Sequence, residues 1–162
     1  MKTLYLVRHA KSSWDDFQLT DFQRPLNDRG LRDAPRMAAL LAAQSNPPEK
    51  LVSSPAERAI TTARFFAEAL GIAPAEILEA PRIYEASVAT IMEVIHELDD
   101  NWNAVALFGH NPAFSYVAGA FPGERVGDMP TCAIVTLSST ADAWADLEPH
   151  NTRISHFMYP KQ

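Results

Sequence analysis

The chain has 162 residues, 47% of them hydrophobic, which suits one domain with a sizeable core and argues against disorder. Its net charge of −6 argues against a general binder of nucleic acids or membrane surfaces, and no stretch approaches the roughly 20 apolar residues that cross a bilayer. Cys132 is the only cysteine, which excludes an intrachain disulfide and a cysteine metal cage. We therefore expect a single domain over residues 1–162, monomeric and cytoplasmic, with no cofactor, no metal, and no nucleic-acid or membrane partner.

The N-terminal part of the chain predicts a buried strand followed by a helix. Residues 4–7 form an apolar run of strand length. Asn27 can cap a helix, and Pro35 is expected to kink or divide it. The apolar face of this helix is expected to carry Leu31, Ala34, Ala38 and Leu41.

A second strand and helix follow. The strand covers residues 51–54. Ser54, Pro55 and Glu57 then form the pattern of a capping box with proline at the first helical position. Gly71 is expected to end this helix. Its apolar face carries Ile60, Ala63, Ala67 and Leu70.

The second half of the chain begins with a helix and ends in strands. The helix after residues 83–87 has a core face of Ile91, Val94, Ile95 and Leu98. The apolar run 104–108 predicts a strand, and Asn111 with Pro112 predicts the start of another helix. Further strands are expected at residues 133–137, 143–147 and 153–158. This order predicts a three-layer α/β/α sandwich, with a mainly parallel central sheet and antiparallel edge strands from the C-terminal third.

Charged and titratable side chains follow three of the predicted strands. Arg8 and His9 follow the first strand, Ser54 ends the second with Arg58 one turn into the next helix, and His110 follows the third. Ligands of open parallel sheets bind at the carboxyl ends of the strands. We therefore expect these side chains to surround one cleft.

Such a cleft is suited to a dianion. Arginine can contact two oxygens and stays charged, and helix N-termini favour anions. A neutral imidazole can attack phosphorus and form a phosphohistidine, while a second, protonated imidazole stabilises charge on the phosphoryl group. The sequence contains neither a Walker P-loop nor an Asp-rich metal motif, which argues against a nucleotide and magnesium site.

Four motifs in this order resemble those of the histidine phosphatase superfamily, the phosphoglycerate mutase-like phosphatases: LVRHAKS, SSPAERAITTA, IYEAS and FGHNP. The short length and the details RHAKSSW, RPLNDRG and GHNP are most similar to the protein-phosphohistidine phosphatase type. The resemblance implies His9 as the nucleophile, with Arg8, Arg58 and His110 in the phosphate pocket. Ala10 departs from the glycine that many members have, a small change that we expect to be tolerated.

The general acid is less clearly indicated. An alkoxide leaving group needs a proton, and Glu85 in YEAS resembles the acidic position of the family. Its alternative role is that of a helix N-terminal glutamate stabilised by the helix dipole. A phosphohistidine leaves as imidazole, whose conjugate acid has a pKa of roughly 6.5, and needs much less help.

Other polar residues near these motifs have two possible roles each. Lys11 and Ser12 follow the nucleophile and could extend the contacts to substrate. Asn111 is either a helix cap or a substrate contact. A loop that either overhangs the cleft or is simply solvated contains Asp15, Asp16, Asp21 and Arg24. Each of these four residues, taken alone, fits solvation better.

The leading hypothesis is a metal-independent phosphatase with a phosphohistidine intermediate on His9. The segment between Arg58 and His110 is short, whereas larger relatives that act on sugar phosphates tend to have insertions there. A short chain implies an open cleft that admits a phosphohistidine of another protein, and the resemblance suggests a histidine phosphotransfer domain of a signalling relay. The alternatives are a small-molecule phosphomonoesterase of loose specificity and, less favoured, a non-catalytic phosphoprotein-binding module.

Overall fold

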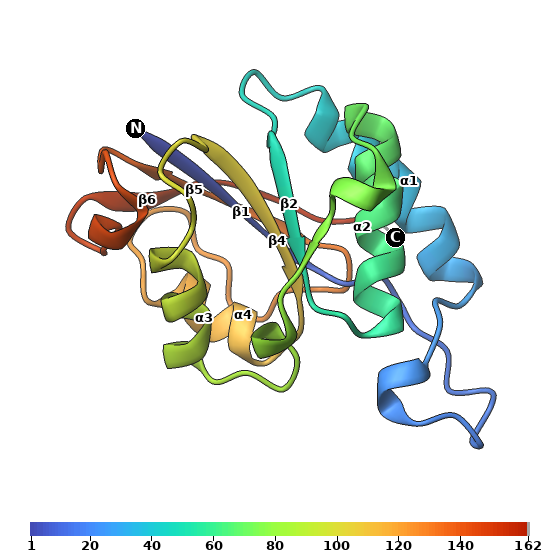
Figure 1. The fold of residues 1–162 in the computed structure, drawn as a ribbon. Coiled ribbons are helices and arrows are strands. Elements are labelled where there is room, and N and C mark those ends of the chain that lie inside the picture. Colours follow the sequence, from blue (N-terminus) through green and yellow to red (C-terminus); the bar gives the residue numbers. More distant parts are fainter. Residues whose placement is uncertain (162) are drawn as a thin grey trace.

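A six-stranded sheet forms the centre of the computed structural model, which describes residues 1–161 (Figure 1). The strands lie in the order β3-β2-β4-β1-β5-β6. Their bounds are β1 (Lys2–Arg8), β2 (Lys50–Ser53), β3 (Leu78–Glu79), β4 (Ala104–Gly109), β5 (Ile134–Ser139) and β6 (Thr152–Met158). The first four are parallel, whereas β5 runs antiparallel to β1 and β6 antiparallel to β5. The predicted fold class is therefore confirmed.

Helices cover both faces of the sheet (Figure 1). α1 (Asp28–Ala42) and α2 (Glu57–Leu70) pack on one face, and α3 (Val88–His96) and α4 (Ala113–Gly119) pack on the other. Short 3-10 helices join these elements: η1 (Asp21–Gln23), η2 (Pro74–Glu76), η3 (Pro81–Ile83) and η4 (Trp144–Asp146). Among the helices of residues 1–161, none is both long and apolar enough to cross a bilayer.

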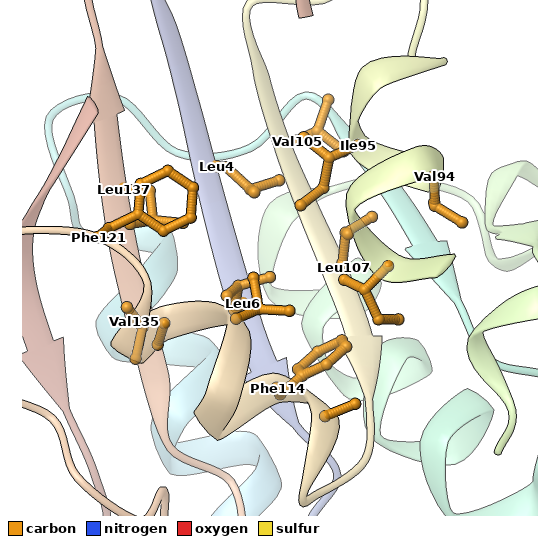
Figure 2. Close-up of a cluster of buried hydrophobic side chains, with 14 of the residues drawn as sticks. Leu4, Leu6, Val94, Ile95, Val105, Leu107, Phe114, Phe121, Val135 and Leu137 are labelled. Atoms are coloured by element: carbon orange, nitrogen blue, oxygen red, sulfur yellow. The ribbon is translucent and has the colours of Figure 1, made fainter. Parts of the chain in front are cut away.

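The two core layers follow from the alternation of side chains along each strand. Leu4 and Leu6 of β1 belong to the cluster under α3 and α4, together with Leu107 and Phe114 (Figure 2). Val7 belongs to the opposite cluster, under α1 and α2. β1 is thus buried on both faces, which explains its continuous apolar run.

The register of the sheet brings three strand ends to one edge. Arg8 at the end of β1 pairs with Gly109 at the end of β4, and Ser53 at the end of β2 pairs with Phe108. The His9 N–H then donates to the Gly109 carbonyl at 3.0 Å, so the next residue is held at the same edge. The predicted convergence of the three strand ends is confirmed.

α1 continues through Pro35, so the prediction that this proline divides the helix is wrong. Proline lacks the N–H that would pair with the Leu31 carbonyl. Both residues lie on the exposed side of α1, where water can take the place of that N–H. Leu31 is 46% exposed and does not belong to the predicted apolar face, whereas Ala34, Ala38 and Leu41 are buried.

α2 begins at Glu57 with Ala56 as its N-cap, so the predicted capping box at Ser54, with Pro55 at the first helical position, is wrong. The Ser54 hydroxyl accepts from the Ala56 N–H at 3.2 Å and lies 2.8 Å from Nε2 of His110. This hydroxyl therefore supports the functional site and the turn before the helix instead of capping its first turn.

The remaining elements differ from the prediction in two details. Gly71 ends α2 with a φ of 72°, as predicted. Leu98 lies beyond the end of α3, partly buried against the core. Residues 143–147, predicted as a strand, contain η4 instead. Trp144 is buried there and its indole N–H donates to the Trp102 carbonyl at 2.9 Å, so a side chain, not a strand ladder, fixes this segment.

Candidate active site

Four of the predicted side chains lie together at the carboxyl edge of the sheet. Arg8 is the last residue of β1, His9 follows it, Arg58 lies in the first turn of α2, and His110 follows β4. The imidazole rings have centroids 5.2 Å apart and are tilted by 51°. Burial first, and then both arginine charges, lower the pKa of both histidines, so the four groups share one electrostatic site.

His9 is held as a neutral imidazole with one available ring nitrogen. It is 7% exposed, and its Nδ1 lies 2.7 Å from the Ala10 carbonyl oxygen. A carbonyl oxygen can only accept, so Nδ1 carries the proton and Nε2 keeps its lone pair. Burial, and then the neighbouring positive charges, lower the pKa of His9 to about 3. Nε2 is therefore a competent nucleophile at neutral pH.

The backbone around His9 is fixed by a residue that is distant in sequence. Cys132 has a φ of 62°, a left-handed conformation that is uncommon outside glycine. Its N–H donates to the carbonyls of both Arg8 and His9, at 3.1 and 3.0 Å. Burial raises the pKa of the Cys132 thiol, so this group stays protonated and its backbone does the positioning.

Thr62 ties the turn after β1 to α2. Its hydroxyl donates to the Arg58 carbonyl at 2.7 Å and accepts from the Ala10 N–H at 3.0 Å. Ala10 is fully buried in the core cluster under α1 and α2, so its methyl group has a packed environment. The turn that carries the nucleophile is thereby fixed relative to Arg58.

Asp21 joins three other side chains of the site. Arg58 donates from Nη2 to its Oδ2 at 3.0 Å and from Nη1 to its carbonyl oxygen at 2.6 Å. The Tyr84 hydroxyl donates to the carboxylate at 2.6 Å, and Arg24 Nε donates at 3.2 Å. The bond from Tyr84 first, and then the arginines, lower the pKa of Asp21 to about 2. Asp21 is therefore an anion that positions Arg58, not a proton donor.

The expectation of a solvated loop residue is wrong for Arg24, whereas Asp21 is exposed to solvent and is nevertheless bound to Arg58 and Tyr84. Arg24 is only 8% exposed and donates to Asp21, to the Ser12 hydroxyl and to the Ser13 carbonyl. The hydrogen bond between Tyr84 and Asp21 joins residues 63 positions apart in the sequence, so no local pattern contains it. The available signal is that Arg24 lies in RPLNDRG and Tyr84 in IYEAS, two motifs that carry the family resemblance.

His110 lies between Ser54 and Tyr84. Its Nε2 is 2.8 Å from Ser54 Oγ, and its ring centroid is 5.6 Å from that of Tyr84. Burial first, and then the Arg58 charge, lower the pKa of His110 to about 4. A phosphoryl dianion beside the ring would raise this pKa, because an opposite charge favours the protonated form.

Three unpartnered nitrogen atoms indicate what the site binds. Within residues 1–161, four buried side-chain atoms have no hydrogen-bond partner, and three of them are Arg8 Nε, Arg58 Nε and His110 Nδ1. The fourth, Asp33 Oδ2, lies 3.4 Å from Arg29 Nε. Each buried unpaired donor costs about 1–3 kcal/mol, and an acceptor-rich group such as phosphoryl removes that cost. In the described part of the chain, no group of three His, Cys, Asp or Glu side chains could hold a metal ion.

Glu85, the predicted general acid, lies at the edge of the site. It follows Tyr84 directly, and its side chain is exposed. Its φ of 54° is left-handed, which costs a residue with a side chain about 1–3 kcal/mol. Backbone strain of this kind is common at functional sites. The role of Glu85 as a proton donor stays a prediction.

Lys11 and Ser12 form the turn after the nucleophile. The Lys11 side chain is exposed, and its carbonyl accepts from the Asn27 N–H at 3.0 Å. Asn27 caps α1 as predicted, and its side chain accepts from the Gly30 N–H. Glycine is required at position 30 because a Cβ there would collide with the Lys11 carbonyl. The Ser12 hydroxyl is buried and accepts from Arg24 Nη1 at 2.6 Å. Direct contact of Lys11 or Ser12 with substrate stays a prediction.

Asn111 does not cap α4, because Pro112 is the N-cap residue of that helix. Its Nδ2 instead donates to Asp128 Oδ1 and to the Met129 carbonyl, both at 3.1 Å. The Met129 carbonyl also accepts from Arg8 Nη1 at 2.8 Å. Asn111 therefore holds the turn that orients Arg8, and its contact with substrate stays a prediction.

A neutral buried histidine among cationic donors, at the carboxyl edge of an α/β sheet, defines a site for phosphoryl groups. Residues 4–129 match the sequence model of the histidine phosphatase superfamily (branch 1). The chain belongs to this superfamily and is a phosphatase.

The relatives of the chain include proteins with different descriptions. An uncharacterized protein of Mycobacterium tuberculosis is 33% identical over 166 residues, which cover 96% of this chain and all of that protein. A solved structure from Agrobacterium tumefaciens, provisionally assigned as the phosphohistidine phosphatase SixA, has a TM-score of 0.82 at 28% identity and covers 99% of both chains. A mycobacterial glucosyl-3-phosphoglycerate phosphatase has a TM-score of 0.71 at 15% identity, covering 95% of this chain and 97% of its own, and shows the fold alone. The predicted resemblance to the short phosphohistidine phosphatase type is confirmed.

Replacing Asp21 with Asn should lower kcat/KM for a small aryl phosphate by about tenfold to hundredfold, the cost of a misplaced contact group. Asn keeps the size of the side chain but loses the charge that holds Arg58. Steady-state kinetics should show both a higher KM and a lower kcat. Asp15→Asn in the same loop should change neither. Unaltered kinetics in Asp21→Asn, with an unchanged free energy of unfolding, would contradict the positioning role.

The depressed pKa values of His9 and His110 predict a dependence of stability on pH. Between about pH 6.5 and pH 4 the unfolded chain binds protons on these rings that the folded chain does not bind, so the free energy of unfolding falls as the pH falls. Urea unfolding should show a shallower fall in a His9→Asn, His110→Asn double variant. Added inorganic phosphate should make the wild-type fall shallower too. Equal slopes in wild type and variant would contradict the neutral state of the two rings.

Proposed function

We propose that this phosphatase is metal-independent and hydrolyses phosphohistidine on a cytoplasmic protein, namely the histidine phosphotransfer domain of a signalling relay. The observation that carries the proposal is the arrangement of His9. Its Nε2 keeps a lone pair, while buried nitrogen atoms of three neighbouring residues, two of them guanidinium donors, have no partner within residues 1–161. A nucleophile and unsatisfied donors at one site are what phosphoryl transfer requires.

In the first step, Nε2 of His9 attacks the phosphorus atom in line with the leaving group. The nitrogen lone pair forms the N–P bond, and the electrons of the breaking bond stay with the leaving group. Arg8 and Arg58 hold the equatorial oxygens, whose charge spreads in the transition state. His110 donates to the same oxygens and gains a proton more easily as negative charge accumulates beside it.

In the second step, water attacks the phosphohistidine on His9. The N–P bond breaks, its electrons return to Nε2, and the water proton leaves with the phosphate or the solvent. The proton stays on Nδ1 of His9, hydrogen-bonded to the Ala10 carbonyl, throughout, which keeps Nε2 in the reactive form. Because the arginines neutralise phosphoryl charge in both steps, the chain's own cations supply what a metal ion supplies in other phosphatases.

The leaving group favours phosphohistidine over an alkyl phosphate. When the second ring nitrogen of the substrate phosphohistidine carries a proton, the leaving group is neutral imidazole, whose conjugate acid has a pKa of roughly 6.5, whereas an alkoxide needs a positioned acid. Asp21, the carboxyl bound to Arg58, is held as an anion, which leaves Glu85 as the candidate acid, in an exposed position. The 28% identity to a chain provisionally assigned as SixA supports the same substrate.

The proposal is tested by comparing kcat/KM for a phosphorylated histidine phosphotransfer domain, a phosphoserine peptide and sugar phosphates, without added metal. The phosphohistidine protein should be the best substrate by at least about tenfold. His9→Ala should abolish turnover and acid-labile labelling of the enzyme, since no other group then forms the N–P bond. A preference for sugar phosphates would favour the small-molecule phosphomonoesterase, and binding without turnover would favour a non-catalytic phosphoprotein-binding module. Substantial turnover by clean His9→Ala protein would rule out the mechanism.

Replacing Glu85 with Gln should separate the two kinds of leaving group. We expect hydrolysis of an alkyl phosphate to slow by about 10²–10⁴-fold, the usual contribution of a general acid, and that of phosphohistidine to slow far less. The measurement is single-turnover kinetics on both substrates. Equal losses would show that Glu85 does not protonate the leaving group.

A further inference from the structure

One segment next to the site exposes large aromatic side chains. Trp14, Phe17 and Phe22 are 72%, 91% and 40% exposed, and they are the only exposed tryptophan and phenylalanine residues among residues 1–161. We call these three side chains the aromatic rim. Single exposed apolar residues are normal, but several large ones in one segment indicate an interaction surface.

The aromatic rim is connected to the catalytic pocket at both ends. Phe22 packs edge-on against Tyr84 at 5.1 Å between centroids, and Tyr84 in turn lies 5.6 Å from His110. At the other end, the Arg24 guanidinium lies 3.5 Å from the Trp14 ring centroid and donates to the carboxylate that holds Arg58. The segment around η1 extends beyond α2 in Figure 1. A partner that reaches the pocket therefore meets this segment.

We infer that the aromatic rim docks the protein that presents the phosphorylated histidine; this inference rests on the proposed function. A standard interface of about 800 Å² per partner is roughly 30 Å across, so one interface covers both the pocket and Phe22, which three ring contacts separate from His9. Aromatic side chains are the usual anchors of such interfaces. A small phosphorylated molecule fills the pocket and leaves the aromatic rim in water.

The charges near the aromatic rim specify the partner surface further. Asp15 and Asp16 lie between Trp14 and Phe17 and are exposed. A groove of ≈ 370 Å³ next to them is lined by Asp15, Asp28 and Arg29, among other residues, so acidic side chains outnumber basic ones there. The partner surface around its phosphohistidine is therefore apolar and carries a basic side chain opposite Asp15.

The test compares two substrates that carry the same reacting group. The probes are a purified histidine phosphotransfer domain phosphorylated with phosphoramidate, and free N-phosphohistidine. Phe17→Ala should lower kcat/KM for the phosphorylated domain by about tenfold, as for an interface anchor, and leave that for free phosphohistidine within about twofold. Leu40→Ala, which removes a 49% exposed apolar side chain near the other end of α1, should change neither.

A second variant tests the charge. Asp15→Lys should lower kcat/KM for the phosphorylated domain, more strongly at low salt, without lowering that for free phosphohistidine. Equal effects of Phe17→Ala on both probes, or none on either, would overturn the docking surface while leaving the proposed function intact. A wild-type enzyme that hydrolyses neither probe would overturn the proposed function itself. A change of mass in sedimentation on Phe17→Ala would assign the aromatic rim to self-association and overturn the inference.

Discussion

The ion pair between Arg58 and Asp21 is the interaction on which the site depends. A phosphate pocket needs positive charge in a partly buried place, and buried charge is unfavourable unless it is paired and hydrogen-bonded. Asp21 meets this requirement from outside the pocket, because it binds two terminal nitrogens of Arg58 and leaves Nε without a partner within the described residues. The guanidinium is therefore fixed before substrate arrives, and the remaining donor is available to a phosphoryl oxygen. The same carboxylate fixes Arg24 and Tyr84, so one anion organises one side of the pocket.

Burial first, and then the fixed arginines, keep the histidines neutral. A buried imidazole is poorly solvated as a cation, and positive charge beside it disfavours the cation further, so His9 stays neutral and its Nε2 keeps its lone pair. In mild acid the two histidine rings bind protons in the unfolded chain but not in the folded protein. The free energy of unfolding therefore falls as the pH falls. A bound phosphoryl group reverses the balance, because its negative charge offsets the arginines and allows His110 to be protonated. The empty site therefore keeps His9 neutral, and a bound phosphoryl group stabilises the folded protein.

The convergence of the candidate site residues could be predicted from the sequence because they lie at strand ends. An apolar run that ends in Arg8 and His9 identifies both a buried strand and its functional edge, and parallel pairing brings His110 to the same edge. The predictions that failed depend on contacts between distant segments. The Ser54 hydroxyl was expected to cap a helix but faces His110, and Trp144 anchors a turn through Trp102 where alternation predicts a strand. No local pattern contains either contact.

The same distinction separates the chemistry from the choice of substrate. The sheet fixes Arg8, His9 and His110 at one edge, and the same fold occurs in a glucosyl-3-phosphoglycerate phosphatase at 15% identity, so the fold by itself does not identify a substrate. The loop around Asp21 is not dictated by the sheet, yet it carries both the carboxylate that fixes Arg58 and the aromatic side chains that face solvent. The residues that orient Arg58 and the exposed aromatic side chains thus lie on one short segment, so a substitution in this loop can change both. The sheet leaves this segment free to differ between proteins of one fold, provided that a carboxylate still reaches Arg58.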